Sequence, residues 1–302
     1  MAPHSMHQSF INFRNYRYGL IASAASLITV GAYMLDRPRV PPNGSTWLGY
    51  TLGTVAALLV IFLALFGIRK RSFSSNIGTA IGWVSAHVYL GIAALLIATL
   101  HSGMHFGANV HTVAYVLMCV VTLSGLWGVY AYVNFPGAMI QQRGNLRRSE
   151  FLRQIAEIDG AALELAEGIS PQITQLFAES ARRTDLGGGS LWKQLRGRDE
   201  STLLLGIGAA PRRSHVAPNT NQRALIQTLA ELRTGRSHNQ VALSSVQKLL
   251  ELAGSKAALL QRLRRETQLA ALLRIWLFLH VPSCCALLAA LIIHVVTVFL
   301  YW

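Results

Sequence analysis

Five stretches of the chain are apolar enough and long enough to cross a lipid bilayer, and this constrains the fold more than any other feature. They cover approximately residues 18–35, 47–68, 80–102, 112–133 and 275–301. The hydrocarbon core of a bilayer is about 30 Å thick, and a helix needs about 20 residues to cross it. We therefore expect an all-α fold, a polytopic membrane helix bundle with five transmembrane helices.

Charged residues are concentrated in one polar insert. Of the 13 acidic residues, 12 lie between Arg143 and Arg274, together with 20 of the 27 basic residues. The whole chain is 52% hydrophobic and only 13% charged, which favours a membrane protein over a soluble one. We expect a four-span membrane region over 1–136, a polar helical insert over 137–274, and over 275–302 a fifth transmembrane helix that completes the bundle.

Basic residues in short flanking segments predict the orientation, because Lys and Arg in short loops stay on the cytoplasmic side. Three of them at 69–71 follow the second span, and three between 143 and 148 follow the fourth. The segment 101–111 between the third and fourth spans has none. We expect a multi-pass protein of the bacterial inner membrane, with its N-terminus and insert in the cytoplasm and Trp302 outside.

The insert has the pattern of helices separated by breakers. Residues 147–169 and 170–183 carry helical spacing, and in the second segment Ser170 is the expected N-cap with Pro171 at the first helical position. Glycine- and proline-rich segments at 184–190 and 206–221 predict loops. From about Asn239 the helical pattern continues into the fifth span. A docking surface and a basic domain resting on anionic lipid headgroups both remain open for this insert.

Histidines repeat with the same spacing in the third and fifth spans. His87 and His101 enclose "VYLGIAALLIATL", and His280 and His294 enclose "VPSCCALLAALII". Fourteen helical residues at about 100° each bring the side chain back to within about 40° of its starting direction, over a rise of about 21 Å. The two spans are separated by one other span and so run in the same direction. We expect His87 level with His280 near the cytoplasmic end, and His101 level with His294 near the outer end.

Four imidazoles at two levels of an apolar bundle predict two haem b groups. An ionisable side chain inside a membrane indicates function, and haem b is held without covalent bonds by two axial imidazoles. The sequence has no CxxCH motif for covalent haem, and its three cysteines lie within the spans, where they suit packing. Small residues that would leave room for a macrocycle follow the ligands, although close helix packing explains them equally well; they are Gly91, Gly103, Ser283, Cys284 and Ala286.

The two histidine pairs resemble the di-haem core of the cytochrome b superfamily and of the ferric-reductase-like membrane proteins. The resemblance covers the ligand helices, and it implies axial roles for His87, His101, His280 and His294. In contrast to the reductases, no flavin or nicotinamide domain follows the last span in this sequence. The resemblance therefore implies an electron-transfer subunit supplied by quinol or by another subunit of a larger oxidoreductase.

Several functional expectations follow for this membrane core. Electrons would cross the membrane through the haems, to or from an external c-type cytochrome, and a quinone is a further candidate cofactor. His105 and His111, near the outer end, are candidates for contact with quinol or with a redox partner, and ordinary loop roles remain open for both. The alternative is a metal-ion transporter that uses the intramembrane histidines, although such a path usually adds carboxylates or thiolates. No nucleic-acid partner is expected.

Overall fold

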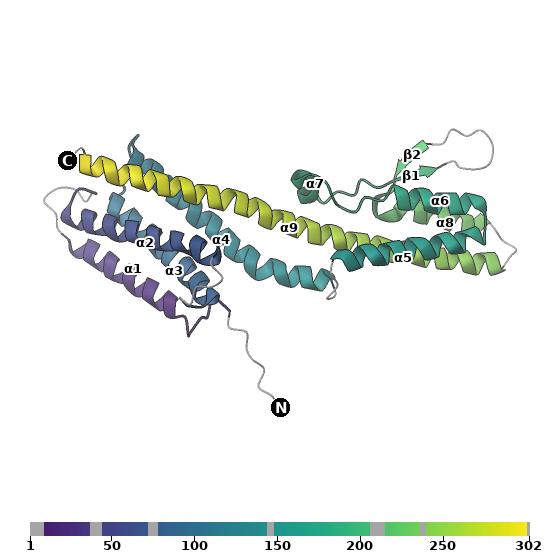
Figure 1. Ribbon diagram of the computed structural model, residues 1–302, viewed down its shortest axis with the longest axis horizontal. Coiled ribbons are helices and arrows are strands. Elements are labelled where there is room, and N and C mark those ends of the chain that lie inside the picture. The colour runs from purple at the N-terminus through teal and green to yellow at the C-terminus, as the bar shows by residue number, and fades with distance from the viewer. Residues whose placement is uncertain are drawn as a thin grey trace, which may run out of the picture. The chain divides into compact units, whose positions relative to one another are not determined.

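The computed structural model describes residues 9–36, 44–71, 78–143, 148–205, 215–235 and 240–300, and the described residues of all five apolar segments lie in helices. These helices are α1 (Arg17–Leu35), α2 (Trp47–Arg71), α3 (Ala80–Ser102), α4 (Val110–Arg143) and α9 (Gln240–Leu300) (Figure 1). Each is long and apolar enough to cross a membrane by its length and composition. The prediction of a mostly helical chain with five helices long and apolar enough to span a membrane is thereby confirmed.

The chain divides into two compact units. Unit 1 comprises Met1–Ala131 and Trp276–Trp302, and unit 2 comprises Tyr132–Ile275. The helices α4 and α9 each contribute to both units. Unit 1 therefore contains all the histidines of the candidate ligand set, and unit 2 corresponds to most of the polar insert.

Helix α3 begins and ends at residues that satisfy its free backbone groups. The side chain of Thr79 accepts a hydrogen bond from the backbone N–H of Gly82 at 3.1 Å, which caps the first turn. At the other end Gly103 has φ 55°, a left-handed conformation that glycine adopts without strain and that closes the helix. The helix that carries His87 and His101 thus has defined ends, and Gly103 acts as its C-cap.

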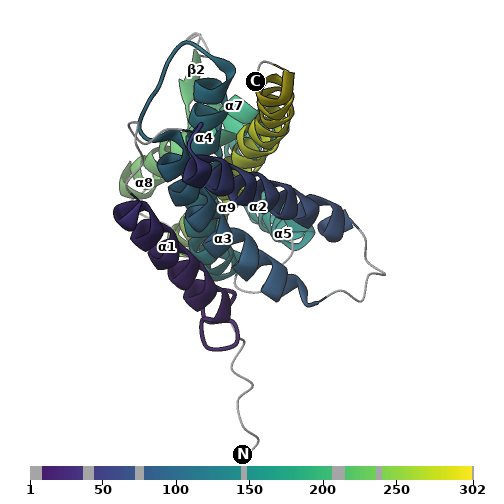
Figure 2. The ribbon, with the colours of Figure 1, turned by 90° about the vertical axis from the view of Figure 1, so that its left-hand side faces the viewer.

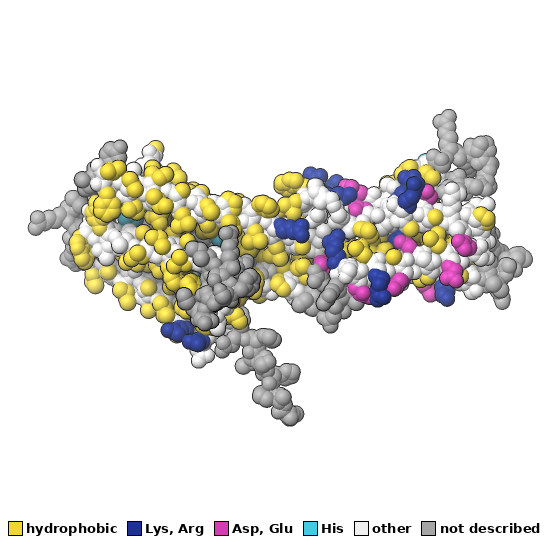
Figure 3. Space-filling model, viewed as in Figure 1, with side chains coloured by type: hydrophobic (Ala, Val, Ile, Leu, Met, Phe, Trp, Pro, Cys, Tyr) yellow, Lys and Arg dark blue, Asp and Glu magenta, His cyan; other side chains and the backbone are white. Residues whose placement is uncertain are grey.

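The apolar surface of unit 1 is suited to lipid. Large side chains such as Leu27, Ile28 and Phe299 are exposed by 73%, 72% and 80% respectively. A soluble helix of this kind would bury one apolar face, whereas these helices are apolar around their circumference. On the face drawn in Figure 3, hydrophobic side chains cover unit 1, while most charged side chains gather on unit 2.

Helix α3 is the centre of unit 1, because it packs against both α1 and α2 (Figure 2). It also meets α4 and α9 in a buried cluster of Ala94, Met118 and Leu287. Ala94 lies seven residues from both His87 and His101, and Leu287 lies seven residues from both His280 and His294. The midpoints of the two histidine repeats therefore share one apolar layer, as expected for two helices that run in the same direction and in register.

Unit 2 is held together by a core of amphipathic helices: α5 (Arg148–Glu167), α6 (Pro171–Arg182), α8 (Arg223–Gly235) and the first part of α9. The short helix α7 (Leu191–Arg196) has no buried residue. Phe177, Leu229 and Leu249, from α6, α8 and α9, are almost fully buried in one cluster.

Two charged pairs are also buried in unit 2, Arg264 with Asp199 at 2.8 Å and Lys256 with Asp159 at 2.7 Å. In both pairs each charge has a partner of opposite sign, because burying an unpaired charge would cost much free energy.

Two predictions about local structure in the insert are confirmed. Ser170 is the N-cap of α6, its side chain accepting from the N–H of Ile173, and Pro171 occupies the first helical position. The helical pattern that begins near Asn239 continues through α9 as one helix of 61 residues into the fifth apolar segment. Pro282 lies inside this helix.

The loop prediction for 206–221 is wrong in part. Strand β2 (His215–Pro218) pairs antiparallel with β1 (Thr202–Leu205), and the short helix η1 (Thr220–Gln222) follows it. Leu203 of β1 is fully buried, so burial of an apolar side chain and pairing of the backbone stabilise a two-stranded ribbon despite the turn-forming composition. The fold is thus helical with one small ribbon.

Some sequence predictions concern residues outside the described part of the chain. These are the start of the N-terminus (1–8), Arg147, Trp302 and the first nine residues of the predicted loop at 206–221.

Candidate functional site

Unit 1 brings five of its histidines together in two groups. His87 of α3 lies with His280 of α9 in the first group. His101 of α3, His111 of α4 and His294 of α9 form the second, which we call the three-histidine cluster. The structure therefore places the four predicted ligands level in pairs, and it adds His111 to one of the levels.

In the first group, the ring of His87 is largely enclosed. It packs against Phe66 of α2, with ring centroids 5.1 Å apart, and it is close enough to His280 to interact with it electrostatically. Its Nδ1 is buried and makes no hydrogen bond of ordinary geometry among the described residues. The backbone of Leu63 on α2 nevertheless lies near enough to the ring to interact with it.

His280 is more firmly held. Its Nδ1 lies 2.8 Å from the hydroxyl oxygen of Ser124 on α4. Its ring stacks on the indole of Trp276, with centroids 5.5 Å apart and planes at 30°. With Nδ1 engaged by Ser124, Nε2 is the nitrogen that remains to bind a ligand.

The three-histidine cluster has three imidazoles in mutual contact. Ring centroids are 4.9 Å apart for His111 and His294, 5.2 Å for His101 and His111, and 6.3 Å for His101 and His294. One ring nitrogen from each residue lies within 4.8 Å of those of the other two, and Nδ1 of His111 is 3.5 Å from Nε2 of His294. Imidazole nitrogens at such separations are suited to binding a transition metal.

The tautomer of His101 is determined by its neighbour. Its Nδ1 lies 2.7 Å from the carbonyl oxygen of Gly49 on α2. A carbonyl oxygen only accepts, so Nδ1 of His101 carries the proton and donates, and Nε2 keeps its lone pair. Metal-binding histidines are commonly oriented by such a bond from the second nitrogen.

Gly53 of α2 makes the position of the His101 ring possible. A Cβ atom at Gly53 would lie 2.6 Å from Cε1 and 2.8 Å from Nδ1 of His101. The ring therefore packs directly on the backbone of α2, where any larger residue would collide with it.

The position of His111 affects how haem iron could bind between His101 and His294. Two imidazole nitrogens on opposite sides of a metal, each at about 2 Å, are about 4 Å apart. The separation of the His101 and His294 rings leaves room for such a pair. The His111 ring, however, is nearly equidistant from both and lies beside the line that joins them. A haem between His101 and His294 therefore requires the His111 ring to turn aside, whereas a single metal ion could use all three.

The remaining sequence candidates lie elsewhere. His105 is exposed, and its Nδ1 lies 2.8 Å from the carbonyl of Gly103, so it belongs to the loop and not to the cluster. Gly91 makes only ordinary contact, since a Cβ there would be 3.9 Å from Leu63. The close approaches to a histidine ring occur instead at Gly53 of α2 and at Gly44 just before that helix, where a Cβ would lie 2.6 Å and 3.2 Å from Cε1 of His101.

Sequence reasoning named His111 as a candidate for contact with quinol or a redox partner but did not place it beside His101 and His294, and it missed Ser124. The position of His111 could have been inferred, because a short loop returns the chain from His101 to the start of α4 at the same level of the bundle. Ser124 carries no comparable signal, since a lone serine in an apolar helix usually bonds to its own backbone.

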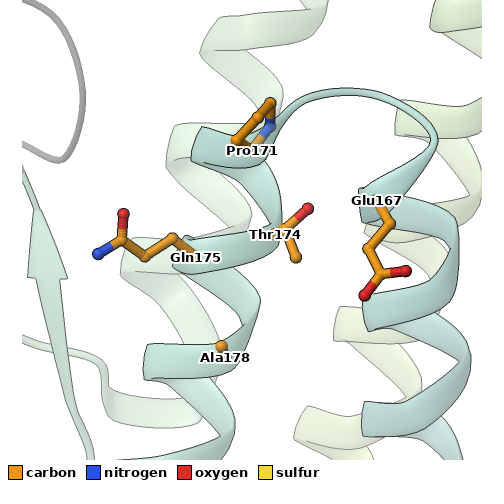
Figure 4. A pocket seen from close by; sticks show the side chains of 5 residues that line it. All are labelled: Glu167, Pro171, Thr174, Gln175 and Ala178. Atoms are coloured by element: carbon orange, nitrogen blue, oxygen red, sulfur yellow. The ribbon is translucent and has the colours of Figure 1, made fainter.

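Unit 2 offers a pocket of a different kind, between α5 and α6. It is lined by Glu167, Pro171, Thr174, Gln175 and Ala178, and Gln175 points away from Glu167 (Figure 4). The polar groups do not converge on a common point, and Glu167 is the only ionisable residue in the lining. The histidine groups of unit 1 are therefore the stronger candidate site.

Comparisons with protein-family models, with curated proteins and with solved structures find no match to this chain. The function of this chain is therefore inferred from the geometry of the two histidine groups.

The contact between α4 and Trp276 yields a prediction about Gly128. A Cβ atom at Gly128 would lie 2.2 Å from the Trp276 ring, so we expect Gly128→Ala to displace this tryptophan and to lower stability by about 1–3 kcal/mol through overpacking. Thermal unfolding of the purified protein in detergent, followed by tryptophan fluorescence, measures both effects. Gly137→Ala on the same helix is the matched control, because nothing lies within 4 Å of its Cβ position. Equal stability of the two variants would contradict this packing.

Proposed function

We propose that this protein is a di-haem b-type cytochrome that carries electrons across the membrane. The axial ligands are His87 with His280 at one level and His101 with His294 at the other. The observation that supports this most directly is the shared layer of Ala94 and Leu287, because it aligns the two histidine repeats so that each level holds one imidazole from α3 and one from α9.

The state of the ring nitrogens is a second line of support. Bound haem supplies an iron that accepts and releases one electron at each level. Iron needs a nitrogen lone pair from each ligand, and Nε2 of His101 has one because Nδ1 donates to the Gly49 carbonyl.

The surroundings of the histidines suit electron transfer better than proton pumping. The described parts of α1, α2 and α3, and α4 as far as Arg143, contain no Asp or Glu, so they offer no carboxylate path for protons. Apolar helices would shield the two levels from water and hold the ligands in fixed positions.

We assign the protein to the bacterial inner membrane, with the insert on the cytoplasmic side, as one subunit of a quinol-linked oxidoreductase. Quinol oxidation releases two electrons and two protons, and the electrons would pass singly through the two levels to a c-type cytochrome outside. The exposed ring of His105 near Gly103 is available to such a partner. His111 is placed to contact quinol only if its ring leaves the cluster.

Paired substitutions test the assignment of ligands to levels. We expect His87→Ala and His280→Ala to lose the same haem, and the double variant to lose no more than either single variant, because both residues bind one iron. His101→Ala and His294→Ala should lose the other haem. Reduced-minus-oxidised spectra with redox titration identify which haem remains. The cross-level variant His87→Ala/His294→Ala should lose both, and retention of one haem in it would contradict the level pairing.

A second candidate function is metal-ion binding or transport, and the three-histidine cluster is the observation that favours it. Three half-buried imidazoles whose nitrogens lie within 4.8 Å of one another could bind an ion such as Zn²⁺ without any macrocycle. Acidic and thiolate ligands are lacking around the cluster within the described residues, which is less usual for a transport path.

Substitution of His111 distinguishes the two functions. Under the haem proposal we expect His111→Ala to retain two haems, since His101 and His294 supply the axial pair, and pigment analysis measures this. His105→Ala is the control, because that ring lies outside the cluster. A haem-free wild type that binds one Zn²⁺ per chain, with binding lost in His111→Ala and kept in His105→Ala, would support the metal-ion function instead.

A further inference from the structure

Ser124 of α4 joins two side chains of α9 through both its backbone and its hydroxyl group. Its carbonyl oxygen accepts a hydrogen bond from Nε1 of Trp276 at 2.8 Å. Its hydroxyl oxygen lies 2.8 Å from Nδ1 of His280. Trp276 and His280 are four residues apart and so lie one helical turn apart on the same face of α9.

The single proton of the Ser124 hydroxyl determines the direction of the bond to His280. This hydroxyl donates to the carbonyl oxygen of Val121 at 2.9 Å. A serine hydroxyl has one hydrogen and two acceptor lone pairs, so toward His280 it can only accept. Nδ1 of His280 therefore carries the proton and donates, and Nε2 keeps the lone pair that a metal ligand needs.

The ring of His280 is also restrained from its sides. The Trp276 indole stacks on it, and that indole rests on the bare backbone of Gly128. On α4, a Cβ at Gly125 would lie 3.5 Å from Cε1 of His280, which is ordinary contact. Helix α4 thus presents Ser124, Gly125 and Gly128 as one surface that receives the Trp276 and His280 rings.

We propose that Ser124 is a positioning residue of the His87–His280 site, which sets the tautomer and orientation of His280 and tunes the iron that His280 binds. The inference rests on the proposed haem function and extends it. A hydrogen bond from the second nitrogen of a ligating imidazole raises the basicity of the ligand. A more basic ligand favours the ferric state, so the Ser124 hydroxyl lowers the reduction potential of that haem.

At the His101–His294 level, a backbone group and not a side chain sets the tautomer of the histidine. There the acceptor for Nδ1 of His101 is the backbone carbonyl of Gly49, which a side-chain substitution does not remove. A substitution that removes the Ser124 hydroxyl therefore removes the hydrogen bond to His280 and leaves the His101–His294 level intact as an internal reference.

Redox titration of the purified, haem-loaded protein tests this role, with Ser124→Val and Ser124→Thr as a pair of equal shape. Threonine keeps a hydroxyl that can bond to the preceding turn and accept from His280, and valine lacks it. We expect Ser124→Val to raise the midpoint potential of one haem and leave the other unchanged, and to weaken retention of that haem by about 10–100-fold. Ser124→Thr should restore both properties.

Ser283→Ala is the control, since Ser283 lies close to His280 in sequence but its hydroxyl donates to the carbonyl of Leu279 at 2.8 Å and bonds to no histidine ring among the described residues. It should leave both potentials unchanged. If Ser124→Val leaves both potentials at the wild-type values, or Ser124→Thr shifts as far as Ser124→Val, the positioning role is overturned while the haem function stands. A wild type without haem would instead overturn the proposed function itself.

Discussion

The cost of placing an imidazole in an apolar bundle governs the arrangement of unit 1. A neutral imidazole has one donor and one acceptor, and in hydrocarbon both need partners. The protein provides a backbone carbonyl for His101 and a serine hydroxyl for His280, each on a neighbouring helix. Each bond leaves one nitrogen lone pair available at its level. Two of the four repeated histidines are therefore held in position by groups of a neighbouring helix.

The register of α3 against α9 places the histidines at two separate levels. The fourteen-residue spacing repeats in α3 and α9, and the contact of Ala94 with Leu287 and Met118 aligns the repeats at their midpoints. The two levels are about 21 Å apart along the helix axis. A change of register by one residue would turn the imidazoles away from each other at both levels at once. Small residues contribute most where helices meet, as Gly53 does beneath His101.

The parts of the structure that were predictable depend on local sequence patterns. The span of α3, the Ser170 cap of α6 and the continuity of α9 follow from apolar runs, capping residues and helical spacing, which act within a few residues. The ribbon of β1 and β2 was missed because its stability comes from the burial of Leu203 in a core built by distant helices.

The candidate site was likewise predictable only in part. The four repeated histidines were visible as a pattern, but the place of His111 and the bond from His280 to Ser124 arise from packing between helices far apart in sequence. The identity of a hydrogen-bond partner across a helix interface depends on rotation of each helix about its axis. The spacing of residues within one helix does not indicate how that helix is rotated against its neighbour.

The haem content of the protein tests most directly whether the four repeated histidines hold two haem b groups. A pyridine haemochrome assay on the purified wild-type chain counts non-covalent b-type haem against protein concentration. We expect two haems per chain. Purified, folded protein that contains no haem would contradict this expectation.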